Sequence, residues 1–117
     1  MTDTLNIFET STVQYDKAIR DGNYKIANKY QDSIVKTIVS LHEGNKLLIL
    51  ERFLYHEVFS TRLWAAFALL PIETAKCESV LESLASSNQL GSLDARIVLE
   101  QWKDASLVFP YESNWKW

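Results

Sequence analysis

The chain of 117 residues contains only one cysteine, three glycines, two prolines and two histidines. The single thiol, Cys77, cannot form an internal disulfide, so a disulfide-stapled fold is excluded. The longest uncharged apolar run ends at Ile72 and is far shorter than the roughly 20 residues that cross a bilayer. An acid, Asp3, stands where a secretory signal needs basic residues. We therefore expect a cytoplasmic protein with no membrane partner.

Positive charge is also in short supply. The chain has 12 basic and 15 acidic residues, a net charge of −3, whereas nucleic-acid and anionic-membrane binders need an excess of Lys and Arg. We therefore expect no direct binding to nucleic acid. The apolar share of 47% is typical of a globular protein of this length. These numbers predict a single domain over residues 1–117, with 110–117 as an aromatic C-terminal tail.

Between the glycines and prolines, apolar residues recur at intervals of three and four, and no run alternates with a period of two. The pattern predicts six helices, centred on Leu5–Ile19, Ala27–Leu41, Leu47–Leu54, Leu63–Leu70, Cys77–Leu84 and Ala95–Trp102. The connections are short, which favours antiparallel neighbours. We therefore predict an all-α fold with about six helices in antiparallel pairs, as a short HEAT-like right-handed α-solenoid or helical bundle.

Polar residues ahead of these segments are candidate helix caps. Asn23 precedes the second helix, Ser60 or Thr61 the fourth, and Ser92 the sixth. The same spacing predicts the buried core, which comprises Leu47, Leu50, Leu63, Phe67, Leu81, Leu84, Val98 and Trp102.

One run of residues resembles a known motif. Arg62-Leu63-Trp64-Ala65-Ala66, followed by Leu69-Leu70-Pro71, is similar to the signature helix of HEAT-like repeats. More narrowly, residues 5–110 resemble a small bacterial family catalogued as domain of unknown function 2019. Further parts of that likeness are Gly22-Asn23-Tyr24, Asn28, Leu47–Leu54, Leu81–Leu84 and Leu99-Glu100-Gln101-Trp102. The resemblance implies a HEAT-like helical fold, and it implies no catalytic residues.

The chain departs from that family's pattern in one place. Glu57 and Val58 stand where an Asp/Pro-type turn is usual, Thr61 replaces an aliphatic residue, and Trp64 replaces a polar one. Because these departures cluster around a single turn, we expect them to mark a specialised surface.

Neither histidine begins a complete zinc motif. His42-Glu43 and His56-Glu57 each start like the helical motif with two histidines four residues apart, but Lys46 and Ser60 occupy the second position. Cys77 falls in the apolar stripe of its helix, as a small core residue does, and no phosphate loop, nucleophile elbow or dinucleotide fingerprint is present. We therefore expect no catalytic residue, no metal and no cofactor.

Aromatic and acidic side chains are the candidate partner contacts, because tryptophan and tyrosine dominate binding hot spots and acids attract basic partners. Trp64 lies at the edge of its stripe, where it either shields a neighbour or meets a partner. The tail either folds back over the last helices, contacts a partner, or does both, and the acids also suit plain solvation. The candidate partner-binding residues are Tyr55, His56, Glu57, Trp64, Glu78, Glu82, Trp115 and Trp117.

Three classes of function remain. Helical repeat folds of this size resemble several immunity proteins, which bind and neutralise a cognate toxin. A nuclease toxin would present a basic cleft to an acidic inhibitor. The alternatives are a general helical scaffold or regulatory protein with no toxin partner, and an enzyme or nucleic-acid-binding HEAT-like module, which charge and motifs both oppose. We favour the immunity protein, monomeric in its free state.

Overall fold

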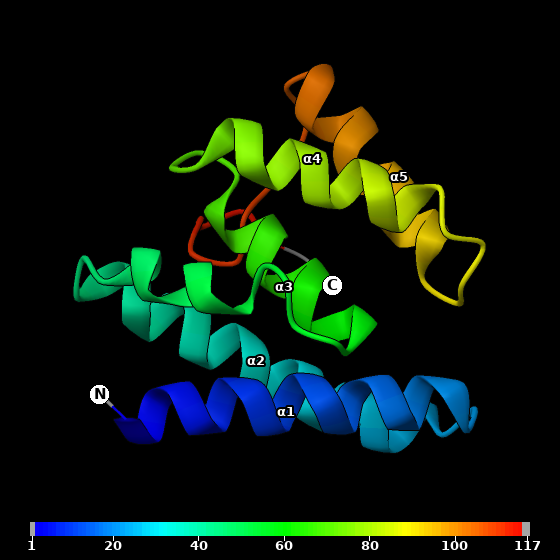
Figure 1. Cartoon of the computed structure of the whole chain (residues 1–117). Coiled ribbons are helices and arrows are strands. Elements are labelled where there is room, and N and C mark those ends of the chain that lie inside the picture. The colour runs from blue at the N-terminus through cyan, green and yellow to red at the C-terminus, as the bar shows by residue number, and fades with distance from the viewer. Residues whose placement is uncertain (1, 116–117) are drawn as a thin grey trace.

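The structure, a computed structural model, describes residues 2–115, and all of the regular secondary structure in that range is helical (Figure 1). The prediction of an all-α fold with about six helices in a small bundle is therefore confirmed. The helices are α1 (Thr2–Arg20), α2 (Tyr24–Glu43), η1 (Leu47–Phe53), α3 (Phe59–Leu69), α4 (Thr74–Ala85) and α5 (Ser92–Lys103).

The first two helices pack side by side as a hairpin (Figure 1). The chain reverses at Gly22, whose φ of 71° suits a residue without a side chain. Asn23 then caps α2 as predicted, because its side-chain oxygen accepts a hydrogen bond from the Ile26 amide at 3.2 Å. A hydrogen bond of 2.9 Å between the Ser11 and Ser33 hydroxyls also joins α1 to α2.

The third predicted helix is present, but it is a 3₁₀ helix, η1. Its buried residues Leu47, Leu50 and Phe53 are spaced by three, which places them on one face of a helix with three residues per turn. Leu54 follows at the C-cap and has no exposed surface. The spacing of three and four that we counted did not distinguish the two helix types.

The most deeply buried helix is α3. It lies between the α1–α2 hairpin and the α4–α5 pair and also contacts η1 (Figure 1). Nine of its 11 residues are buried. The predicted caps Ser60 and Thr61 are inside the helix, and the N-cap is Val58, which makes no side-chain cap hydrogen bond. The first turn of α3 therefore needs partners from elsewhere in the chain.

The last two helices, α4 and α5, pack against each other after a turn that ends at Gly91. Gly91 is the N-cap of α5, so the predicted cap Ser92 is instead the first helical residue. The φ of Gly91 is 101°, and a Cβ atom built on it would lie 2.8 Å from Cε1 of Phe59. Only glycine allows this turn to pack so closely on the start of α3.

One hydrophobic core joins all six helices. Of the predicted core residues, Leu47, Leu50, Phe67, Leu81 and Leu84 are buried, and the other three are half-buried at its edge: Leu63, Val98 and Trp102. The radius of gyration, 13.1 Å, is close to the value of about 13 Å expected for a compact domain of this size.

After α5, the chain folds back across the core. Phe109 is buried and stacks on Phe67, with ring centroids 5.4 Å apart, and Tyr111 stacks on Phe109 at 5.5 Å. The His42 ring at the end of α2 stacks on the other side of Tyr111 at 3.9 Å. These four nearly parallel rings run from the surface to the core and tie the C-terminal segment to α2.

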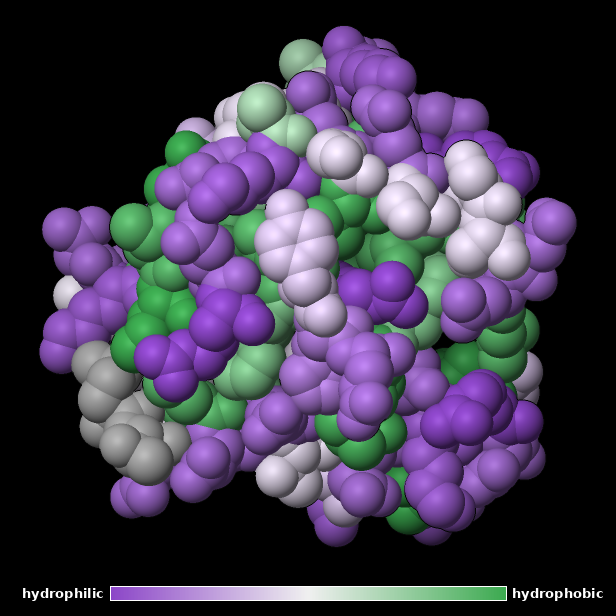
Figure 2. All heavy atoms as spheres, viewed as in Figure 1, coloured by the Kyte–Doolittle hydropathy of each residue, from purple (hydrophilic) through white to green (hydrophobic). Residues whose placement is uncertain are grey.

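Hydrophilic side chains cover most of the face seen in Figure 2, and hydrophobic side chains show mainly in the spaces between them. Among the helices within residues 2–115, none combines the length and the hydropathy needed to cross a membrane.

The turn at Gly91 gives a stability prediction. We expect Gly91→Ala to lower the free energy of unfolding by about 1–3 kcal/mol, because it combines a strained φ with a clash against Phe59. Gly44→Ala is the matched control, since Gly44 has a φ of −83° and a Cβ there would meet only ordinary contacts, the nearest at 3.5 Å. That control should change stability by less than about 1 kcal/mol.

Urea unfolding followed by circular dichroism measures both variants. Equal midpoints for Gly91→Ala and the wild type would contradict the close packing of the turn on Phe59.

Candidate functional site

One face of α1 carries three polar side chains, Glu9, Thr12 and Asp16. Their spacing of three and four residues places them in a row, and all three bond to the segment 56–61 that leads into α3. The central contact joins the hydroxyls of Thr12 and Thr61 at 2.7 Å, and neither residue has exposed surface. This polar row fixes the position of the start of α3 against α1.

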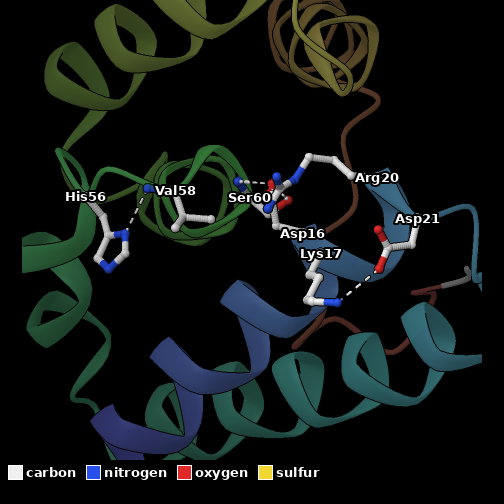
Figure 3. A network of polar contacts seen from close by, with 7 residues as sticks. All are labelled: Asp16, Lys17, Arg20, Asp21, His56, Val58 and Ser60. Atoms are coloured by element: carbon white, nitrogen blue, oxygen red, sulfur yellow. Dashed lines mark hydrogen bonds and ion pairs between the residues drawn. The ribbon is translucent and has the colours of Figure 1, made fainter.

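Asp16 supplies the cap that α3 lacks. Its Oδ1 accepts hydrogen bonds from the amide and the hydroxyl of Ser60, at 3.2 and 2.8 Å, and its Oδ2 accepts one from Nε of Arg20 at 2.9 Å. Figure 3 shows Asp16 and Arg20 reaching from α1 to the first turn of α3. The carboxylate satisfies an otherwise orphaned amide at the positive end of the helix dipole.

His56 holds the turn just before α3. Its Nδ1 accepts a hydrogen bond from the Val58 amide at 3.0 Å, as drawn in Figure 3, so the ring proton resides on Nε2. Nε2 in turn donates to Oε2 of Glu9 at 2.8 Å. Both ring nitrogens are therefore engaged within the chain, and His56 acts as a structural link between α1 and the turn.

A cleft of about 260 Å³ lies beside this network, between the second half of α1, the start of α3 and the α4–α5 turn. Three acids line it, Asp16, Glu57 and Asp94, against one basic side chain, Arg20. The other side chains that line the cleft are mainly apolar or aromatic: Tyr15, Ile19, Val58, Phe59, Leu63 and Leu90. The cleft thus combines apolar walls with a net charge of −2, from three acids and one base.

The electrostatics of the cleft are those of a partly desolvated acidic site. Removal from solvent raises the pKa of the Asp94 carboxyl. The pKa of Tyr15 is also raised, chiefly by burial and then by the negative charges of Asp94 and Asp16. Tyr15 therefore keeps its proton at neutral pH and presents a neutral hydroxyl to a negative site.

Trp64 is the clearest correction to the predicted partner surface. Only 8% of its surface is exposed, and its ring packs edge-on against Tyr15, with centroids 6.1 Å apart. We expected α3 to have one buried stripe, but helices cover it on several sides, so the edge of the stripe is also inside. Trp64 takes the shielding role and supports the wall of the cleft from behind.

The three predicted contacts at positions 55–57, in the turn before α3, differ in their surroundings. Tyr55 is 74% exposed and lines a shallow groove with Ser79 and Ser83 of α4. His56, also predicted as a partner contact, is half-buried, and both of its ring nitrogens are bonded within the chain. Glu57 is exposed at the cleft. Of the three, Tyr55 and Glu57 remain available to a partner, on different hollows of the surface.

The two acids predicted on α4 also differ from each other. Glu78 is half-buried and accepts a hydrogen bond of 2.9 Å from the indole Nε1 of Trp102, so it ties α4 to α5. Glu82 is exposed on α4. Neither acid lines the cleft that contains Glu57 or the groove that contains Tyr55.

The described part of the aromatic tail folds back onto the core, and its contact with a partner stays a prediction. Trp115 is half-buried and packs against Phe67, with ring centroids 6.0 Å apart. Trp117, the other predicted contact of the tail, lies outside the described residues.

The titratable residues of the cleft other than Glu57 were not among the predicted partner contacts: Tyr15, Asp16, Arg20 and Asp94. One signal was available for Asp16, because it continues the stripe of Leu5, Phe8 and Thr12 at a spacing of four and is therefore directed inward. No spacing links positions 16, 57 and 94, which the fold alone brings together.

Comparison of the chain with models of protein families, with curated proteins and with solved structures gave no match. The family resemblance drawn from Arg62–Pro71 and the other short motifs therefore stays a prediction. Within residues 2–115, no three His, Cys, Asp or Glu side chains are grouped so that they could hold a metal ion.

The Asp16 cap can be tested by mutation. Asp16→Ala should lower the free energy of unfolding by about 1–3 kcal/mol, because it leaves the buried Ser60 amide and hydroxyl without an acceptor. Asp16→Asn keeps one oxygen acceptor and should lose less. The matched control is Asp21→Ala, which breaks an exposed i,i+4 pair with Lys17 and should change stability by less than about 0.5 kcal/mol.

Urea unfolding measures the series. Equal losses for Asp16→Ala and Asp21→Ala would show that the contact with α3 contributes nothing beyond a surface ion pair.

Proposed function

We propose that this protein is a non-catalytic binding module of the cytoplasm, an immunity protein that neutralises a cognate toxin by forming a stoichiometric complex with it. The observation that carries the proposal is the acidic cleft between α1, α3 and the α4–α5 turn. It has three acids against one arginine, apolar walls, and the exposed Leu90 on its lining. Acidic charge around apolar contact area suits a basic protein partner.

The chemistry of nucleases favours this class of toxin. A nuclease binds a polyanion, so its substrate cleft carries Lys and Arg side chains. An inhibitor that covers such a cleft gains both affinity and a fast association rate when its own surface is acidic. The net charge of −3 and the acidic cleft both agree with that role.

The groups best suited to catalysis have other roles in this fold, which also supports a binding module. Cys77 has no exposed surface, and burial together with the nearby Glu73 and Glu51 carboxylates raises the pKa of its thiol to about 12. His56 uses both ring nitrogens within the chain, and His42 stacks on Tyr111.

The inertness of Cys77 is directly measurable. At pH 8, a thiol with a pKa of about 12 is ionised in roughly one molecule in 10,000. We therefore expect an aromatic disulfide reagent to label native protein very slowly and protein unfolded in urea at once. Full labelling of the native protein within minutes would contradict the buried position of Cys77 and reopen a nucleophilic role.

The proposed function is tested with the protein encoded by the adjacent reading frame, which the proposal predicts to be a toxin. We expect co-expression to restore growth, the purified proteins to elute as a 1:1 complex, and each added molecule to inhibit one toxin molecule. Cys77→Ala and His42→Ala should protect as well as the wild type, because neither residue is placed at the cleft.

Other outcomes would point elsewhere. A substoichiometric amount that silences the whole toxin pool over time would indicate an enzyme. Full toxicity with no complex would contradict the immunity function and favour the alternative, a helical scaffold or regulator without a toxin partner.

A further inference from the structure

We infer that the cleft is an arginine-binding site, which takes the guanidinium of one side chain of the partner between Glu57 and Asp94. This inference rests on the proposed function, since it names the contact through which the partner is held. The two acids come from different elements, Glu57 from the turn before α3 and Asp94 from the first turn of α5, and both line the same cleft.

These two carboxylates are available, whereas the third is not. The Asp16 carboxylate accepts hydrogen bonds from Ser60 and Arg20. Its ion pair with Arg20 also neutralises the one positive charge of the lining. Among the described residues, neither Glu57 nor Asp94 has a hydrogen-bond or ion-pair partner. A cation that enters the cleft therefore meets two unneutralised acids, and Asp94 is already partly desolvated.

The walls of the cleft suit the rest of an arginine side chain. Leu63 and Leu90 offer apolar surface to its methylene groups, and the Tyr15 ring, backed by Trp64, offers an aromatic surface to the guanidinium. Arginine fits better than lysine because its planar group has donors on several sides and can bond to two carboxylates, and because it is less strongly hydrated.

The cleft is held in shape before any partner arrives. Asp16 anchors Ser60 on one side, and on the other side Gly91 lies so close to Phe59 that no side chain would fit between them. A site held in this way loses little conformational entropy on binding, which favours affinity.

The site can be tested without the partner, with N-acetyl-arginine methylamide as the probe. We expect millimolar binding in amide NMR spectra, with shifts concentrated at Tyr15, Ser60, Gly91 and Asp94. The citrulline analogue, which has nearly the same shape but no charge, should cause no such shifts. Equal shifts with both probes, or shifts located away from the cleft, would overturn the inference.

Variants give the second test. Glu57→Gln/Asp94→Asn should abolish the arginine shifts and weaken binding of the toxin domain by at least about tenfold. The control Glu43→Gln/Glu100→Gln removes the same charge from exposed acids outside the cleft that were not predicted as partner contacts, and it should leave both nearly unchanged. Melting temperatures verify that each variant is folded, and the citrulline comparison needs no variant.

The outcomes separate this inference from the proposed function. If the wild type neutralises the toxin but neither the probe nor Glu57→Gln/Asp94→Asn has the expected effect, the arginine site is wrong and the immunity function stands. If the probe binds in the cleft but no toxin is neutralised, the site stands and the proposed partner is wrong.

Discussion

The contact on which the rest of this structure most depends joins the Asp16 carboxylate of α1 to the first turn of α3. Because α3 begins at Phe59 without a capping side chain of its own, its N-terminal amides need an acceptor, and Asp16 provides it. The same contact sets α1 against α3, and α3 in turn contacts η1 and α4. Together with the Thr12–Thr61 and Glu9–His56 contacts beside it, this buried carboxylate sets how the N-terminal hairpin meets the remainder of the core.

The helices could be predicted because each one carries its own signal. Apolar residues recur at intervals of three and four in every helical segment from Leu5 to Trp102. The Asn23 side chain caps α2 by bonding to an amide only three residues away in the sequence. Local spacing did not separate the 3₁₀ geometry of η1 from an α-helix. It also missed the start of α3, because the groups that satisfy Ser60 come from position 16, far away in the sequence.

The tertiary contacts of the aromatic residues could not be predicted either, because they also join residues that are far apart in the sequence. Trp64 was placed at a surface edge on the assumption that α3 is covered on one side, whereas packing on several sides buries it. The stack of His42, Tyr111 and Phe109 joins the end of α2 to the C-terminal segment, which local periodicity cannot foresee. The candidate site was predictable only through Glu57, which alone among the predicted partner contacts within residues 2–115 lines the cleft.

Structural and binding demands meet at this cleft without conflict. The buried acid, Asp16, is fully used in holding α3, and its charge is matched by Arg20, so it adds stability rather than affinity. The exposed acids, Glu57 and Asp94, make no structural contacts among the described residues and can change with the partner at little risk to the fold. If the cleft binds a basic partner as proposed, a rigid frame with replaceable acids at its rim would let one helical bundle discriminate among related partners, because specificity is a difference in affinity that a few rim charges can reverse.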